Sequence, residues 1–302
     1  MSRIFTLTML AETLRISVPY ACAAVAGVWS ERAGVVNIAL EGVLLSSAFG
    51  AAAMTIATGS PTAGILAGVL TGVALSLLHG VLAAQYRVDA IVSGIAMNLL
   101  AASGTRFLLR AFYDSSSNSP SYAAFGIGPT GASGMDLMAR ALLDPVMLLA
   151  LAAVTVTPLV LYRTRFGLRV RACGENPVAA AAVGIRVVRV RLAALVVSGA
   201  IGALGGIHLT FDQHRFESGM SGGRGFIALA AVIVAGWRAW HAALACLAFA
   251  ALEATQILLQ DQRNIPHELV QMLPYVATLV ILAFAAGRSR APAGLGKHAT
   301  WG

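Results

Sequence analysis

The sequence predicts an all-α membrane protein, a polytopic helix bundle of about 8–10 spans. Of its 302 residues, 58% are hydrophobic and only 11% are charged, whereas about 25% of the residues of a soluble domain are charged. The mean hydropathy is +0.79. Several apolar runs also reach the roughly 20 residues that a helix needs to cross a bilayer. We therefore expect one transmembrane domain over residues 1–302.

The apolar runs predict the individual spans in order along the chain. All but the seventh, which is short, are long enough to cross the hydrocarbon core of a bilayer. The predicted spans are residues 9–29, 40–58, 61–85, 90–112, 142–162, 190–210, 226–236, 241–259 and 269–286.

The basic residues fix the orientation of this bundle. Residues 162–191 hold seven arginines against one acidic residue, Glu175. Positive charge near the ends of spans stays on the cytoplasmic side, so the loop 163–189 is predicted to be cytoplasmic. Counting spans from there puts the tail with Lys297 inside as well. The loops predicted to lie outside are 113–141, 211–225 and 260–268.

The cytoplasmic loop contains a short helix signal. Residues Gly174, Glu175, Asn176 and Pro177 predict a turn that opens a helix over 178–183. Asn176 suits the cap, Pro177 suits the first turn, and Gly184 can end the helix. Because so short a helix between two spans has nothing of its own to pack on, we expect a partner to bind it.

The segment 31–42 between the first two spans predicts a broken or re-entrant helix. It is short and apolar, yet it carries Glu31, Asn37 and Glu41. Irregular backbone at membrane depth is tolerated only where protein buries it or where it lines a cavity. An ordinary tight cytoplasmic turn is the equal alternative.

Polar residues within spans are candidates for a translocation pathway, because they are costly in lipid. The candidates are Asn37, Glu41, Ser93 and Asn98. Hydrogen bonding between helices explains Ser93 equally well. His79 and Glu253 are interpreted as structural residues.

Composition excludes several other classes of function. The net charge of +8 comes from arginines at span ends, which orientation in the bilayer explains without nucleic acid. The three cysteines lack metal or disulfide spacing, and the polar loop 211–225 suits an outer gate or docking surface better than a metal site. No phosphate-binding glycine loop with lysine occurs in the sequence, so we expect any energy source to lie in another subunit.

Five segments in order resemble the simple-sugar and nucleoside ABC transporter permeases, relatives of the ribose and branched-chain amino acid permeases. The resemblance extends from about residue 28 to residue 297. It is strongest to the shorter permease of guanosine-type uptake systems. The segments are Glu31–Gly42, Ile91–Asn98, Phe166–Pro177, Gly225–Val232 and Pro292–Lys297.

The resemblance implies a set of partners that the residues alone do not show. They are a second homologous permease, with a heterodimer expected, a cytoplasmic ABC ATPase that uses ATP, and an extracytoplasmic solute-binding lipoprotein. The loop 163–189 would couple to the ATPase through Gly174, Glu175, Asn176, Pro177 and Gly184. No cofactor, metal or nucleic acid is expected on this chain, and the location implied is the bacterial inner membrane with a cytoplasmic C-terminus.

The sequence thus predicts a non-enzymatic permease subunit of an ATP-driven importer, with a nucleoside as the first choice of solute and a simple sugar as the second. A secondary transporter would need paired membrane carboxylates or an inverted repeat. An intramembrane enzyme would need clustered acids and histidines facing one leaflet. The sequence shows neither pattern.

Overall fold

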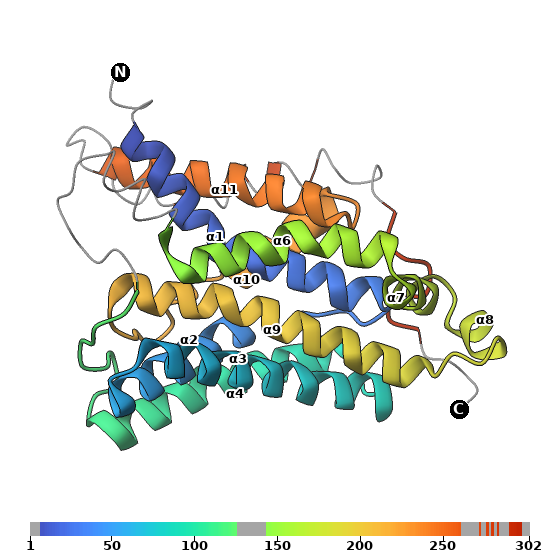
Figure 1. Ribbon diagram of the computed structural model, residues 1–302, viewed down its shortest axis with the longest axis horizontal. Helices are drawn as coiled ribbons and strands as arrows, with labels where there is room; N and C mark the ends of the chain where they lie inside the picture. Colours follow the sequence, from blue (N-terminus) through green and yellow to red (C-terminus); the bar gives the residue numbers. More distant parts are fainter. Residues whose placement is uncertain are drawn as a thin grey trace.

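The computed structural model describes residues 7–125, 143–260 and 290–297, with isolated positions between 272 and 283. These residues form helices that lie side by side along the long axis of the molecule (Figure 1). The described part of the chain contains no strand, which confirms the all-α prediction. The helices are α1 Leu7–Arg32, α2 Leu40–Thr58, α3 Pro61–Gly80, the π-helix η1 Val81–Gln85, α4 Ala90–Tyr113, α6 Pro145–Arg163, α7 Arg165–Glu175, α8 Pro177–Ala182, α9 Val187–Gln213, α10 Arg224–Val234 and α11 Ala239–Gln260.

Among the described residues, six helices are long and apolar enough to cross a membrane: α2, α3 with η1, α4, α6, α9 and α11. Each agrees with a predicted span to within a few residues. α1 also coincides with the predicted first span and has 26 residues. α10 has only 11 residues, roughly 16 Å at 1.5 Å per residue, so it reaches about half-way across the hydrocarbon core. The predicted span 269–286 lies largely outside the described residues.

Small residues let the central helices approach one another closely. A Cβ atom built on Gly206 of α9 would lie 2.1 Å from the carbonyl oxygen of Leu44 in α2. One built on Gly72 of α3 would lie 2.7 Å from the Cβ atom of Ala203 in α9. α9 is thus packed backbone to backbone against two neighbouring helices.

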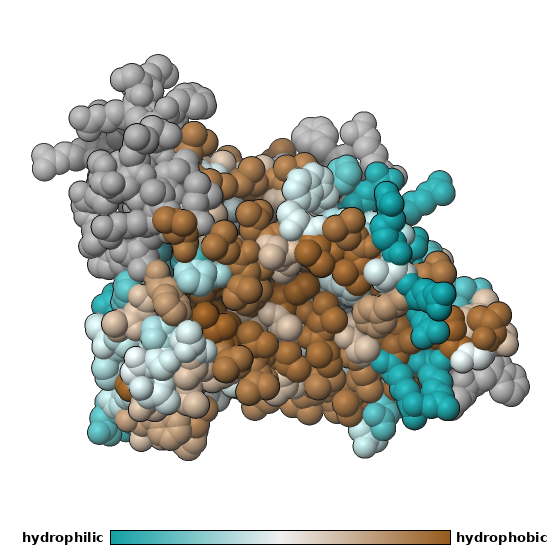
Figure 2. Space-filling model, viewed as in Figure 1, coloured by the Kyte–Doolittle hydropathy of each residue, from teal (hydrophilic) through white to brown (hydrophobic). Residues whose placement is uncertain are grey.

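The surface divides into an apolar middle and polar ends (Figure 2). The hydrophilic stripe at the end near α7 is made by exposed arginines, here called the basic belt. Its members are Arg163, Arg165, Arg169, Arg186 and Arg189. This pattern fits the predicted cytoplasmic position of the loop.

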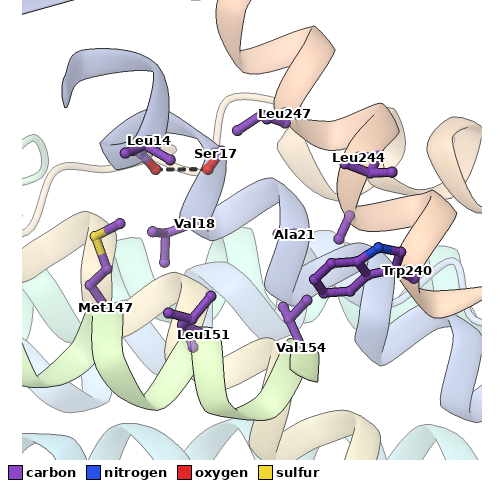
Figure 3. A pocket seen from close by; sticks show the side chains of 12 residues that line it. Leu14, Ser17, Val18, Ala21, Met147, Leu151, Val154, Trp240, Leu244 and Leu247 are labelled. Atoms are coloured by element: carbon purple, nitrogen blue, oxygen red, sulfur yellow. Dashed lines mark hydrogen bonds between the residues drawn. The ribbon is translucent and has the colours of Figure 1, made fainter. Parts of the chain in front are cut away.

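An apolar groove of about 200 Å³ lies between α1, α6 and α11 (Figure 3). Its polar side chain, Ser17, donates its hydroxyl hydrogen to the carbonyl oxygen of Leu14 at 2.7 Å. The rest of the lining is hydrophobic, including Met147, Val154 and Trp240. Because the lining is almost entirely apolar, with the Ser17 hydroxyl bonded to Leu14 and the Trp240 indole N–H as the other polar group, we do not consider the groove a site for a polar solute.

We predict that Gly206→Ala destabilises the bundle by about 1–3 kcal/mol, because the added methyl group overpacks the contact between α9 and α2. The midpoint of thermal unfolding in detergent measures this. Gly104→Ala is the matched control, since a Cβ atom at Gly104 meets nothing within 4 Å. Equal midpoints for the two variants would contradict this packing.

Candidate functional site

The irregular segment predicted near 31–42 is present as residues 33–39, here called the break, between α1 and α2. Gly34 turns the chain with φ +90°, a left-handed conformation that glycine adopts without strain. The break is largely inside the protein, and Asn37 is 0% exposed. A tight, solvated turn therefore does not describe it.

The break ends at about the middle depth of the bundle. A Cβ atom on Gly42 would lie 3.1 Å from the side chain of Leu75 in α3. Leu75 lies ten residues before Gln85, where the α3–η1 helix ends, which is about 15 Å at the helical rise. α2 therefore begins roughly 15 Å from that end of the bundle, half of a typical hydrocarbon thickness.

Side chains from neighbouring helices bind the backbone of the break. His79 Nε2 lies 3.0 Å from the carbonyl oxygen of Val36. Because a carbonyl can only accept, Nε2 carries the proton and Nδ1 accepts from the Ser93 hydroxyl at 3.0 Å. Asn37 itself donates to Ser198 Oγ at 3.3 Å. Its side-chain oxygen has no hydrogen-bond partner within the described residues.

Asn98 of α4 connects the break to the first turn of α2. Its Nδ2 donates to the carbonyl oxygen of Ile38 at 2.9 Å. Its Oδ1 accepts from the backbone N–H of Gly42 at 2.8 Å. The residue that would cap α2 is Ala39, which has no side-chain acceptor. Asn98 therefore supplies from another helix the cap that the local sequence lacks.

Glu41 caps a second discontinuous helix. Its two carboxylate oxygens accept from the backbone N–H groups of Gly223, at 2.8 Å, and Gly225, at 2.7 Å. These amides belong to the N-terminus of α10, where negative charge is stabilised by the helix dipole. The helices α2 and α10 thus begin next to each other, and each is capped by a side chain from a different helix.

Beside this junction lies a charged cluster. Arg224 donates to Glu253 at 2.6 Å, and Tyr20 donates its hydroxyl hydrogen to the other oxygen of the same carboxylate at 2.6 Å. The Arg224 guanidinium also lies over the Tyr20 ring, 5.7 Å from its centroid. Pairing of this kind makes charged groups tolerable within a bundle. Glu253 is thereby neutralised, in line with the structural role predicted for it.

All four predicted pathway residues lie at this junction: Asn37 within the break, Glu41 just after it, and Ser93 and Asn98 against it. Sequence reasoning did not identify Arg224 or Tyr20. Arg224 had a usable signal, because it is a lone charge between Gly222–Gly223 and a run of apolar residues. Tyr20 had none, since a tyrosine within an apolar run is ordinary.

The loop predicted to be cytoplasmic, residues 163–189, forms two helices, α7 and α8. Asn176 caps α8 by accepting from the backbone N–H of Ala179 at 3.0 Å, and Pro177 is its first residue, as predicted. Gly184, with φ +82°, follows its end. The prediction missed α7, reading the residues before Gly174 as loop. Three arginines among its eleven residues obscured the helix, whose buried side is made by Gly167, Val170 and Cys173.

α8 projects beyond the basic belt at the end of the molecule (Figures 1 and 2). Its outer surface is apolar, with Val178 43% and Val183 76% exposed. An exposed apolar surface bordered by charge is typical of a protein–protein contact. This is the part of the loop that a partner could bind.

Gly174 is buried against the end of α1, and Glu175 beside it is exposed but reaches the same end of α1. A Cβ atom on Gly174 would lie 2.1 Å from the carbonyl oxygen of Arg32, and Glu175 pairs with the Arg32 guanidinium at 3.6 Å. Burial raises the pKa of the neighbouring Cys173 thiol, although the Arg191 charge opposes part of that rise. The thiol therefore stays protonated and unreactive. Among the described residues, no group of three His, Cys, Asp or Glu could hold a metal ion.

Comparison with known proteins shows that the chain is similar to transporter permeases. Residues 9–282 match the model of the branched-chain amino acid transport system / permease component family. The chain is 34% identical to the nucleoside ABC transporter permease protein NupC of Lactococcus lactis subsp. cremoris, covering 94% of each chain. It is 33% identical to the guanosine ABC transporter permease protein NupQ of Bacillus subtilis, over 93% of this chain and 92% of that one. It is 27% identical to the glucose ABC transporter permease protein TsgB13 of Haloferax volcanii, over 90% and 76%.

We predict that Asn98→Ala destabilises the junction by about 1–3 kcal/mol for each of the two buried backbone groups left unpaired. Thermal unfolding in detergent measures the loss, and limited proteolysis within 33–42 reports whether it is local. Ser103→Ala, at an exposed position of the same helix, is the control. If Asn98→Ala unfolds at the temperature of the control, Asn98 does not cap α2.

Proposed function

This chain belongs to the branched-chain amino acid transport system / permease component family, and from that premise we propose that it is the membrane permease subunit of an ATP-driven ABC importer for nucleosides. The choice of a nucleoside as solute is supported by the similarity, at 33–34% identity over nearly the whole chain, to permeases named for nucleosides and guanosine. A simple sugar is the second candidate, because a glucose permease is also similar.

The exposed apolar surface of α8 supports a role in coupling. The chain has no nucleotide-binding loop of its own, so ATP hydrolysis takes place on a partner ATPase. In this proposal a groove of the ATPase binds α8, with Asn176, Pro177 and Gly184 setting its ends. Gly174 and Glu175 then carry its movement to the protein behind it. The loop 163–189 is the cytoplasmic part of a single permease domain.

The junction where α2 and α10 begin supports our proposal for the position of the translocation pathway. Asn37, Glu41, Ser93 and Asn98 gather where α2 and α10 begin, about half-way through the bundle. Discontinuous helices with polar side chains at mid-depth are a common construction around transport routes. The unpaired side-chain oxygen of Asn37 is an acceptor that a solute hydroxyl or amine could meet when the bundle halves move apart.

The full transporter proposed has four kinds of subunit: this chain, a second homologous permease, the ATPase and a solute-binding lipoprotein. It works by alternating access, in which nucleotide-driven movement rocks the permease halves about the route. We place it in the bacterial inner membrane with the C-terminus in the cytoplasm, on the side of the basic belt. The chain itself performs no covalent chemistry.

The geometry disfavours an ion-gradient carrier. Glu41 and Glu253 come close to one another around Arg224, but one carboxylate is bound to helix amides and the other to Arg224 and Tyr20. Proton-coupled transport would require at least one of them to exchange protons with water on both sides. Because both carboxylates are hydrogen-bonded within the protein, we infer a structural role for Glu41 and Glu253.

The function is tested by purifying a tagged chain from its own cells in mild detergent and reconstituting what co-purifies. We expect an ATPase and a second permease in the complex. In proteoliposomes supplied with the binding protein, we expect ATP-dependent guanosine uptake that unlabelled nucleosides inhibit and glucose does not. Inhibition by glucose alone would favour the sugar alternative, and uptake without ATP would contradict an ABC importer.

We predict that Val178→Asp with Val183→Asp lowers ATPase binding at least tenfold, because two charges would be buried unpaired in the partner groove. Co-purification of the ATPase at matched expression measures this. Val88→Asp is the control, a valine 36% exposed in the turn before α4. Full retention of the ATPase by the double variant would rule out α8 as the contact.

A further inference from the structure

Residues 292–297, here called the brace, lie between the cytoplasmic loop and the break. The Gly294 N–H donates to the carbonyl oxygen of Gly174 at 2.8 Å, and the Gly296 N–H donates to that of Gly34 at 3.0 Å. The Ala293 N–H also donates to the Glu175 carboxylate at 3.2 Å. One short segment is therefore bonded to the base of α8 on one side and to the break on the other.

Glycine at three positions makes this arrangement possible. A Cβ atom on Gly294 would lie 2.7 Å from Pro177 Cδ and 2.8 Å from the Gly174 carbonyl oxygen. A Cβ atom on Gly174 would lie 2.1 Å from the carbonyl oxygen of Arg32, and one on Gly34 would lie 3.3 Å from the Cα atom of Gly174. At these three glycines the backbones of the loop, the break and the brace come into close contact, leaving no room for an added side chain.

Arg191, the last arginine of residues 162–191, binds both the break and the brace. It is 3% exposed. Its Nε donates to the carbonyl oxygen of Ala33 at 3.1 Å, and its NH2 group donates to that of Lys297 at 2.8 Å. No carboxylate pairs with it among the described residues. A buried charge is tolerated only when its hydrogen-bonding groups are satisfied, so the Arg191 site requires both the break and the brace in place.

The direct polar link between the loop and the end of α1 is weak. It is the Arg32–Glu175 ion pair, in which the Glu175 side chain is 55% exposed, and exposed pairs contribute little to stability. The remaining direct contact is the close packing of Gly174 against Arg32 and Gly34. The brace adds two backbone hydrogen bonds, and Pro292 and Gly294 are buried. Leu295 also packs against the main hydrophobic core.

We propose that the brace, positioned by Arg191, makes the base of the coupling helix α8 and the break move as one unit, so that a displacement of α8 reaches the start of α2. From there Asn98 and Glu41 extend the connection to α4 and α10. This rests on the proposed function, since α8 is displaced only if an ATPase drives it. Arg191 is a positioning residue and does not contact solute.

The first test compares Gly294→Ala with Gly104→Ala in the reconstituted complex. The methyl group that Gly294→Ala adds would displace the brace from Gly174 and Pro177. We expect Gly294→Ala to assemble and hydrolyse ATP, while solute taken up per ATP falls about tenfold, the change that 1.4 kcal/mol produces. Gly104→Ala is expected to keep the wild-type ratio. An unchanged ratio in assembled Gly294→Ala complexes would overturn the proposal.

The second test does not depend on how Gly294→Ala folds. Ala293→Cys and Glu175→Cys place two thiols across the brace and the loop, in a chain whose native cysteines at 22, 173 and 246 are replaced by alanine. Parts that move as one unit can be cross-linked without loss, so we expect the oxidised complex to keep the uptake rate of the same complex when reduced. Loss of uptake on oxidation, restored by reduction, would show that the two parts separate during transport.

Failure of this inference is distinguishable from failure of the proposed function. If the wild-type complex shows no ATP-driven uptake of any nucleoside or sugar, the proposed function fails. If the wild-type complex transports but Gly294→Ala transports with equal efficiency, only the brace is refuted.

Discussion

The structure depends on one constraint, that the backbone of residues 33–39 must be hydrogen-bonded inside the bundle although it forms no helix. A polar backbone group buried without a partner costs as much as a lost hydrogen bond, and here several are buried together. The surrounding elements supply the partners. His79 binds the carbonyl of Val36, Asn98 binds Ile38 and Gly42, and Arg191 binds Ala33. Each polar side chain in this neighbourhood has a function in the fold before it has any in transport.

This constraint also explains how the cytoplasmic end can communicate with the middle of the bundle. The break is continuous with α1 on one side and α2 on the other, and its bonds reach α3, α4, α9 and the 292–297 segment. Glu41, immediately after it, binds the N-terminus of α10. The junction is tightly packed and most of its polar groups are hydrogen-bonded, the side-chain oxygen of Asn37 being an exception among the described residues. Tight packing favours movement of such a unit as a whole over local deformation. In the mechanism that we propose, α8, which lies beyond the basic belt, is the part that a partner displaces.

Much of the fold could be predicted from the sequence, because the spans and the cap of α8 are encoded locally. The apolar runs predicted the long helices, the arginines predicted the belt, and Asn176 with Pro177 predicted the start of α8. Pairings between distant residues could not be predicted. That Glu41 binds amides at Gly223 and Gly225, or that Arg224 meets Glu253, depends on how helices far apart in sequence pack. For the same reason the sequence identified Asn98 as polar and buried but not as the cap of α2, and the resemblance marked residues 292–297 without indicating what they contact.

The position of Arg191 has a consequence for how the protein is made. Its charge is satisfied by Ala33, from an early part of the chain, and by Lys297, which is synthesised after every other described element. During translation Arg191 therefore lacks one of these two bonding partners until residues 292–297 have been synthesised. A chain that ended before residue 292 would leave the Arg191 NH2 group without its bond to Lys297.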